Sequence, residues 1–66
     1  MTAKLGPALY RAIGGDHYAA MITMVNSDGT VQLTTFPPSG APTFLTRIKF
    51  DPKADANTAK PGTCYL

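Results

Sequence analysis

Groups of apolar residues alternate along this 66-residue chain with short groups of Gly, Pro, Asn and Asp. The pattern predicts four strands over residues 8–13, 17–25, 30–36 and 43–50, and a short fifth strand over residues 63–66. Gly adopts positive φ angles at no steric cost and Pro cannot donate to a strand ladder, so the intervening groups predict turns. No uninterrupted helical periodicity is present. The sequence therefore predicts an all-β fold, a small antiparallel barrel or rolled sheet of four to five short strands.

The clearest local signal is a β-hairpin, in which residues 26–29 (NSDG) form the turn between the second and third strands. The second strand is apolar on both faces: one carries Tyr18, Ala20, Ile22 and Met24, and the other carries Ala19, Met21, Thr23 and Val25. A half-exposed strand would instead alternate with polar residues. Two explanations remain open. Either the N-terminal arm or the 53–62 segment covers the outer face, or Met21 and Val25 bind a neighbouring subunit.

The fourth strand has the cleanest alternation in the chain. Phe44, Ile48 and Phe50 share one face with Thr46, while Leu45, Arg47 and Lys49 share the other. We therefore expect Phe44 and Phe50 in the core, and Arg47 and Lys49 together on the outside. After this strand, residues 53–62 (KADANTAKPG) are small, polar and rich in turn formers, which indicates a loop.

The chain is long enough for one domain, which we expect to comprise residues 8–66 behind an N-terminal arm of residues 1–7. The single Cys excludes an intrachain disulfide, and the single His stands apart from any acidic cluster, so no structural metal is expected. Docking on a larger protein assembly or self-association is the remaining source of support. Charged residues make up 15% of the chain, below the usual share of about a quarter, which fits a surface that faces another protein.

No arrangement of residues points to catalysis or to a cofactor. His17 has no Ser or Cys nucleophile beside it, and only Asp16 is close enough in sequence to orient it. The pair Gly14-Gly15 is not followed by the Lys and Ser or Thr of a phosphate-binding loop. No charged residue flanks Cys64, so we expect an inert, packed thiol. The sequence therefore predicts a protein that is not an enzyme and that uses no cofactor or metal.

Membranes and nucleic acids are weaker candidates as partners. The longest apolar run is far shorter than the roughly 20 residues of a membrane helix, and the N-terminus lacks the apolar region of a signal peptide. The net charge is only +2, and the basic residues are scattered. Small barrels do bind nucleic acid through basic and aromatic residues, so we keep such binding as an alternative. The residues that would serve it are Arg11, Arg47, Lys49 and Lys53.

The order of motifs in residues 17–66 resembles that of a family of small tailed-bacteriophage and prophage proteins. In that family an AAxVTxV strand is followed by DGTVxLxVF, a Pro/Gly turn, an FxxxVxYD strand and a PGTWHW ending. The matching positions in this chain are Ala19, Ala20, Asp28, Gly29, Thr30, Val31, Leu33, Phe36, Phe44, Asp51, Pro61, Gly62 and Thr63. Cys64 and Tyr65 stand where the family has Trp and His, which reduces the C-terminal aromatic patch.

The resemblance implies an SH3-like or related small barrel and a place in the virion, which is assembled in the host cytoplasm. A capsid decoration or cement subunit would fit the two-faced second strand and the low charge. We therefore expect a non-enzymatic structural protein that docks on a larger assembly, such as the phage capsid, by apolar burial and strand-edge pairing. The expected contacts come from the arm, the second strand and the C-terminus: Leu5, Pro7, Leu9, Met21, Val25, Tyr65 and Leu66.

Overall fold

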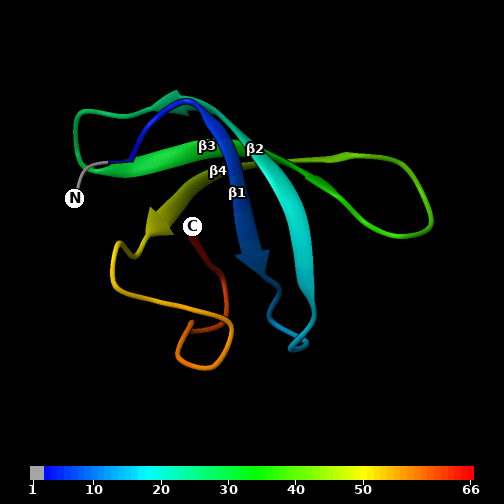
Figure 1. Cartoon of the computed structure of the whole chain (residues 1–66). Helices are drawn as coiled ribbons and strands as arrows, with labels where there is room; N and C mark the ends of the chain where they lie inside the picture. The colour runs from blue at the N-terminus through cyan, green and yellow to red at the C-terminus, as the bar shows by residue number, and fades with distance from the viewer. Residues whose placement is uncertain (1–2) are drawn as a thin grey trace.

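The computed structural model describes residues 3–66, which form an all-β domain (Figure 1). The strands are β1 (Gly6–Arg11), β2 (His17–Val25), β3 (Thr30–Phe36), β4 (Thr43–Phe50) and β5 (Thr63–Tyr65). Each strand pairs with the next and β5 pairs with β1, so the sheet closes into a barrel. The predicted small barrel of four to five strands is confirmed. Within residues 3–66 there is no helix with the length and hydrophobicity needed to cross a bilayer.

Two strands differ from the prediction. β1 begins at Gly6, so Gly6 and Pro7, which we assigned to the arm, pair with β2. β5 runs antiparallel to β1 but parallel to β4, so the barrel is not antiparallel throughout. Parallel neighbours cannot be joined by a tight hairpin. Residues 51–62 provide the longer connection, and Figure 1 shows them crossing one end of the barrel in yellow and orange.

The 51–62 connection is a loop without strand or helix, as predicted, and it is tied to the barrel. The carboxylate of Asp55 accepts a hydrogen bond from the Thr58 amide at 3.0 Å, which closes a local turn. The guanidinium of Arg11 in β1 donates to the Ala59 carbonyl at 2.6 Å, and Ala59 is buried. These contacts hold the loop against β1.

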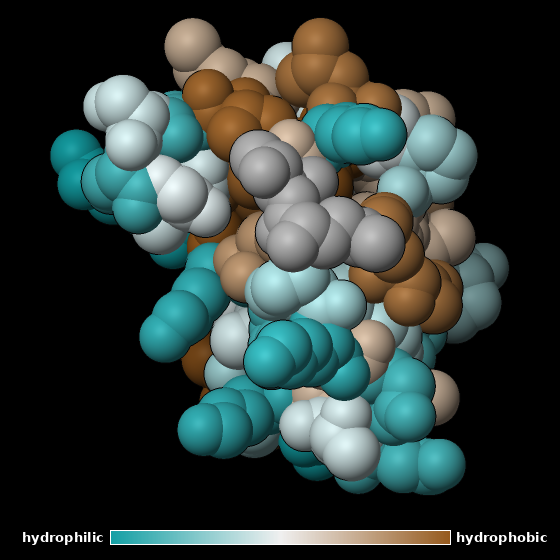
Figure 2. Space-filling view, turned by 60° about the vertical axis from the view of Figure 1, so that its left-hand side comes forward, coloured by the Kyte–Doolittle hydropathy of each residue, from teal (hydrophilic) through white to brown (hydrophobic). Residues whose placement is uncertain are grey.

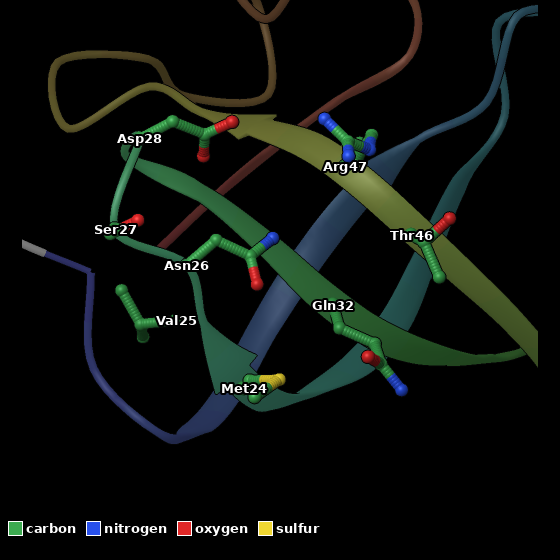
Figure 3. A pocket seen from close by; sticks show the side chains of 8 residues that line it. All are labelled: Met24, Val25, Asn26, Ser27, Asp28, Gln32, Thr46 and Arg47. Atoms are coloured by element: carbon green, nitrogen blue, oxygen red, sulfur yellow. The ribbon is translucent and has the colours of Figure 1, made fainter.

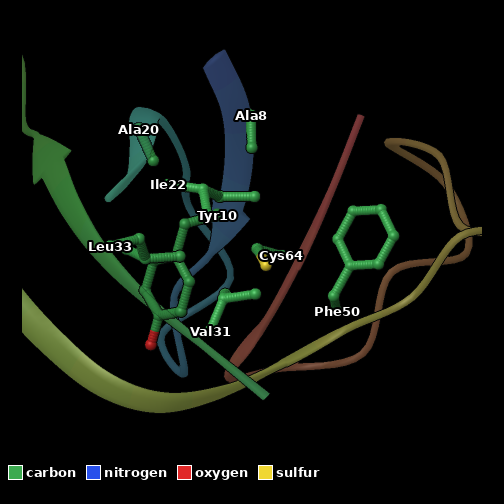
Figure 4. Packing of buried hydrophobic residues seen from close by; sticks show 8 residues of the cluster. All are labelled: Ala8, Tyr10, Ala20, Ile22, Val31, Leu33, Phe50 and Cys64. Carbon is green, nitrogen blue, oxygen red and sulfur yellow. The ribbon is translucent and has the colours of Figure 1, made fainter. Parts of the chain in front are cut away.

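Inward-facing side chains fill the barrel (Figure 4). The core residues are Ala8, Tyr10, Ala20, Ile22, Val31, Leu33, Phe50 and Cys64. Each strand contributes at least one of them, and Val31, Leu33 and Cys64 are completely buried. Because so few side chains join five strands, truncation of one of them removes packing from several strands at once.

A β-bulge changes the direction of the side chains in the second half of β2. Ile22 pairs with Leu33 of β3 and Met24 pairs with Gln32, so two steps along β2 correspond to one step along β3. The extra residue at this point turns Met24 to the outside, where it is exposed, and pairs Val25 with the buried Val31. The prediction that Val25 shares the outer face with Met21 is therefore wrong.

A second bulge has the same effect in β4. Leu45 pairs with Leu33 of β3 and Ile48 pairs with Val31, both of which are buried. Three steps along β4 therefore correspond to two steps along β3. The backbone accommodates the extra residue near Arg47, which adopts a φ of 55°. As a result Leu45 faces inward, and Phe44, which is 74% exposed, faces outward. The predicted faces of these two residues are wrong, whereas the predicted burial of Phe50 is confirmed.

Candidate interaction surface

The reactive side chains of the barrel are engaged in structural contacts. Cys64 is completely buried, and burial raises the pKa of its thiol to about 11, so the thiol stays protonated at neutral pH. The Nδ1 atom of His17 lies 2.5 Å from the hydroxyl of Tyr65, and the two rings meet edge to face. Among residues 3–66 no group of three or more His, Cys, Asp or Glu side chains could hold a metal ion.

The outer surface of the sheet carries apolar side chains on each of β1 to β4. Residues that pair directly in neighbouring strands point to the same side of a sheet. One row of paired residues runs from Pro7 through Met21 and Thr34 to Phe44, and an adjacent row runs from Leu9 through Ala19 to Phe36. We call the apolar members of these rows the outer apolar face: Pro7, Leu9, Ala19, Met21, Phe36 and Phe44.

The outer apolar face is exposed to solvent. Phe36 and Phe44 are 46% and 74% exposed, and they stand at the base of the β3–β4 connection that projects from the barrel in Figure 1. Thr34 points to the same side but is only 8% exposed, because Met21 and Phe44 flank it. Contiguous exposed apolar areas mark interaction sites more often than isolated residues do. The outer apolar face is therefore the leading candidate for a binding surface.

Apolar side chains also reach the surface elsewhere, and their distribution is uneven. On the side of the molecule shown in Figure 2, hydrophobic residues gather in the upper half and hydrophilic residues occupy most of the lower half. Leu5, Ile13, Met24 and Leu66 are exposed outside the outer apolar face. Exposed apolar residues of this kind provide comparison positions for mutagenesis.

The structure brings part of the predicted interface together. Pro7 and Leu9 of β1 and Met21 of β2 all lie on the outer apolar face. Leu5 and Leu66 are exposed, but neither belongs to the two paired rows.

The remaining two predicted contacts add no exposed side chain to the outer apolar face. Val25 lies on the side of Val31 because of the bulge in β2. Tyr65 pairs with Leu9 and so continues the second row into β5, but it is only 1% exposed and its hydroxyl is bound by His17. As an exposed contact, Tyr65 is a wrong prediction.

Phe36 and Phe44 are the surface residues that the sequence-based reasoning missed. Phe44 was assigned to the core because simple alternation places it on the face of Phe50. The bulge reverses that relation, and the left-handed residue at its centre is an Arg, not the Gly that would have signalled it. Phe36, at the end of β3, pairs with Ala19, whose apolar neighbours were the available signal.

The four basic residues proposed for nucleic-acid binding do not form one site. Arg11 is bound to the Ala59 carbonyl, and Lys53 lies exposed in the 51–62 loop. Arg47 lines one hollow, and Lys49 lines a different hollow of about 280 Å³ together with Lys60. The predicted basic spot of Arg47 and Lys49 is therefore divided between two places.

The hollow that contains Arg47 lies between the β2–β3 turn and the bulge of β4 (Figure 3). It has a volume of about 500 Å³ and is open to solvent. Its lining residues are Met24, Val25, Asn26, Ser27, Asp28, Gln32, Thr46 and Arg47. Asp28 accepts hydrogen bonds from the Thr30 hydroxyl and amide, and these bonds, together with the nearby Arg47 charge, lower the pKa of its carboxyl.

No family model, curated protein or solved structure matches this chain.

Proposed function

We propose that this protein is a non-enzymatic structural protein of a bacteriophage particle that docks on a larger protein assembly, most simply the capsid shell. The observation that carries the proposal is the outer apolar face, which crosses four strands and remains exposed in the isolated chain. Burial of such a face contributes about 25 cal/mol for each Å² of apolar area removed from water, from which the entropy cost of association is subtracted. The low charge of the chain and the resemblance of its motif order to small phage proteins support the place in the virion.

Part of one strand edge supports the second predicted mode of docking. β4 pairs with β5 only through Lys49 and Phe50, so residues 43–48 of β4 have no pairing partner in β5. Phe44 of the outer apolar face belongs to this stretch. An unpaired edge accepts an extended segment of a partner, and the adjacent apolar side chains then add side-chain burial. In the proposed complex the face provides affinity and the edge fixes orientation.

The test is incorporation into phage particles that are assembled in a host and purified. Met21→Asp and Phe44→Asp each place a charge on the outer apolar face without removing a core side chain. We expect both variants to remain folded and to bind the particle at least 30-fold more weakly, because a charge at the centre of an interface costs about 2 kcal/mol or more, and so to be depleted from purified particles. Quantitative mass spectrometry of the particles measures the copy number.

Ile13→Asp is the matched control. Ile13 is 82% exposed and lies after β1, outside the outer apolar face. Ile13→Asp introduces the same charge at an exposure comparable to that of Phe44, so this variant should be incorporated as well as the unaltered chain. Normal incorporation of Phe44→Asp would refute docking through this face, and absence of the unaltered chain from particles would refute the virion role. Hundreds of copies per particle would identify shell decoration, whereas a few copies would place the protein at the portal or tail.

Nucleic-acid binding is the alternative function, favoured only by the hollow that Lys49 and Lys60 line. It predicts retention on DNA at low salt and a steep loss of affinity as salt rises. Lys49→Gln and Lys60→Gln together should then reduce the retention. Flow-through of the unaltered protein on a DNA column at low salt would exclude this alternative.

A further inference from the structure

The hollow beside the hairpin turn is built by both bulges of the barrel. The extra residue of β2 and the extra residue of β4 lie on either side of Gln32 in β3, because both register shifts occur at this position. Bulges increase local twist and redirect side chains, and they are frequent beside binding sites. Met24 and Arg47 reach the hollow because of these two shifts, so the irregularities of the sheet converge on one place (Figure 3).

Arg47 is held there in an unfavourable backbone conformation. Its φ of 55° lies in the left-handed region, and it is the one residue other than Gly with a positive φ among residues 3–66. Strain of this kind persists only where the surroundings impose it, and it is a reason to look for a function. Here the pairing of Leu45 and Ile48 with buried residues of β3 imposes it from both sides. The strain fixes the backbone from which the guanidinium projects.

The hollow combines free hydrogen-bond donors with an apolar wall. Within residues 3–66 neither the Arg47 guanidinium nor the Gln32 side-chain amide makes a hydrogen bond, whereas Asn26 is already engaged by Thr30. Met24 is 54% exposed and provides the apolar wall. Asp28 stands on the rim, close enough for Arg47 to contribute to the lowered pKa of its carboxyl.

We propose that this hollow binds a carboxylate side chain, an Asp or Glu of a partner protein, which Arg47 and Gln32 hold by hydrogen bonds from their side chains. A guanidinium matches the planar carboxylate with two parallel N–H donors. Met24 would contact the aliphatic part of the bound side chain. The hollow follows the outer apolar face along β2 and β3, so a partner that covers the face can reach it. The assignment of the carboxylate to the docking partner rests on the proposed function, whereas the binding of a carboxylate in the hollow does not.

The rim carboxylate of Asp28 argues for a single negative charge in the ligand. A phosphate or a nucleic-acid backbone would bring more negative charge close to Asp28, and the hollow has only Arg47 to offset it. A carboxylate brings one charge and leaves amide and hydroxyl groups for further hydrogen bonds. The structure thus favours an acidic protein side chain over a nucleic acid at this position.

The experiment titrates ¹⁵N-labelled full-length protein with N-acetyl-glutamate N-methylamide and follows the amide and side-chain resonances. We expect saturable shifts centred on the Gln32 side-chain amide and the Thr46 and Arg47 resonances, with a dissociation constant on the order of 1–10 mM for a ligand of this size. N-acetyl-glutamine N-methylamide is the neutral control and should bind about tenfold more weakly.

Three variants assign the contacts. Arg47→Gln should weaken binding of the glutamate probe about five- to tenfold, since the charge is lost at an open site. Asp28→Asn should strengthen binding about two- to threefold, because it removes the opposing charge and keeps an oxygen that can accept from Thr30. Thr46→Val, which lines the same hollow, should change binding less than twofold. The spectrum of each variant shows whether it is folded.

Absence of saturable shifts in the folded protein would overturn the proposal, and so would equal affinity for the glutamate and glutamine probes. Tighter binding of a short single-stranded DNA than of the glutamate probe, lost in Arg47→Gln, would replace the carboxylate by a phosphate. Phe44→Asp separates this inference from the proposed function, because it should abolish particle incorporation and leave binding of the glutamate probe unchanged. If Arg47→Gln loses the probe but enters particles normally, the partner is not the source of the carboxylate.

Discussion

Replacement of Arg47 by Gly should stabilise the protein. A residue with a Cβ atom in the left-handed region costs about 1–2 kcal/mol, and Gly avoids this cost. Gly in turn adds freedom to the unfolded chain, which costs about 0.5–1 kcal/mol. The Arg47 side chain is exposed, so its removal takes no packing from the core. The net expectation is a gain of about 0.5–1 kcal/mol in the free energy of unfolding.

The corresponding change in melting temperature is large enough to measure. With 66 residues and an unfolding entropy of about 2.1 cal/mol/K per residue, the chain has an unfolding entropy of about 140 cal/mol/K at its midpoint. A gain of about 0.5–1 kcal/mol therefore raises Tm by about 4–7 °C. Differential scanning calorimetry measures Tm, and urea denaturation at 25 °C checks that the m-value, and with it the exposed area, is unchanged.

Arg47→Ala is the comparator for this prediction. Ala also removes the guanidinium and its attraction to Asp28, but it keeps the Cβ atom that makes the left-handed conformation costly. The difference between the two variants therefore isolates the backbone strain. A Tm of Arg47→Gly equal to or below that of Arg47→Ala would refute the reasoning. Because Arg47→Gly also removes the guanidinium, it should lose affinity for the glutamate probe while it gains stability.

Three further predictions concern the core. Leu33→Ala should lower the free energy of unfolding, measured in urea, by about 2–5 kcal/mol, which approaches the whole stability of a small domain; a loss below 1 kcal/mol would contradict the assigned packing. Because the pKa of the buried Cys64 thiol is raised from 9.0 to about 11, the unfolded chain releases a proton that the folded chain retains, so the free energy of unfolding should fall as pH rises from 9 to 11. The free energy of unfolding of Cys64→Ala should fall less over the same range, and an equal fall would refute the assignment to Cys64. His17→Ala should cost about 1–2 kcal/mol by leaving the buried Tyr65 hydroxyl unpaired, and in a double-mutant cycle Tyr65→Phe should remove most of that cost; full additivity of the two changes would contradict the coupling.

The strand positions could be predicted from the sequence because they depend on local chemistry. The NSDG turn illustrates this: Asp28 accepts hydrogen bonds from Thr30, and Gly29 adopts a φ of 89°. Both preferences belong to the residues themselves. For the same reason the 51–62 loop, with Asp55 bonded to its own backbone neighbours, was recognisable without knowledge of the fold.

The facing of side chains was predictable only up to the two bulges. Ala20, Ile22 and Phe50 are buried as the period-two pattern requires. Beyond the extra residue in each strand the pattern is out of step, which explains the errors at Val25 and Phe44. Neither bulge carries a Gly, so no residue type announces it, and only the pairing with β3 shows where it lies.

By itself the sequence determined an all-β chain, its turns and a second strand with more apolar residues than one buried face requires. The tertiary structure decided the parallel pairing of β5 with β4, the burial of Tyr65 and the position of Phe36 and Phe44 on the same side of the sheet as Met21. The physical reason is the range of the forces involved. Turn conformation is decided within a few residues, whereas strand register is decided by which distant side chains are buried together, and a shift of one residue exchanges the two faces of a strand.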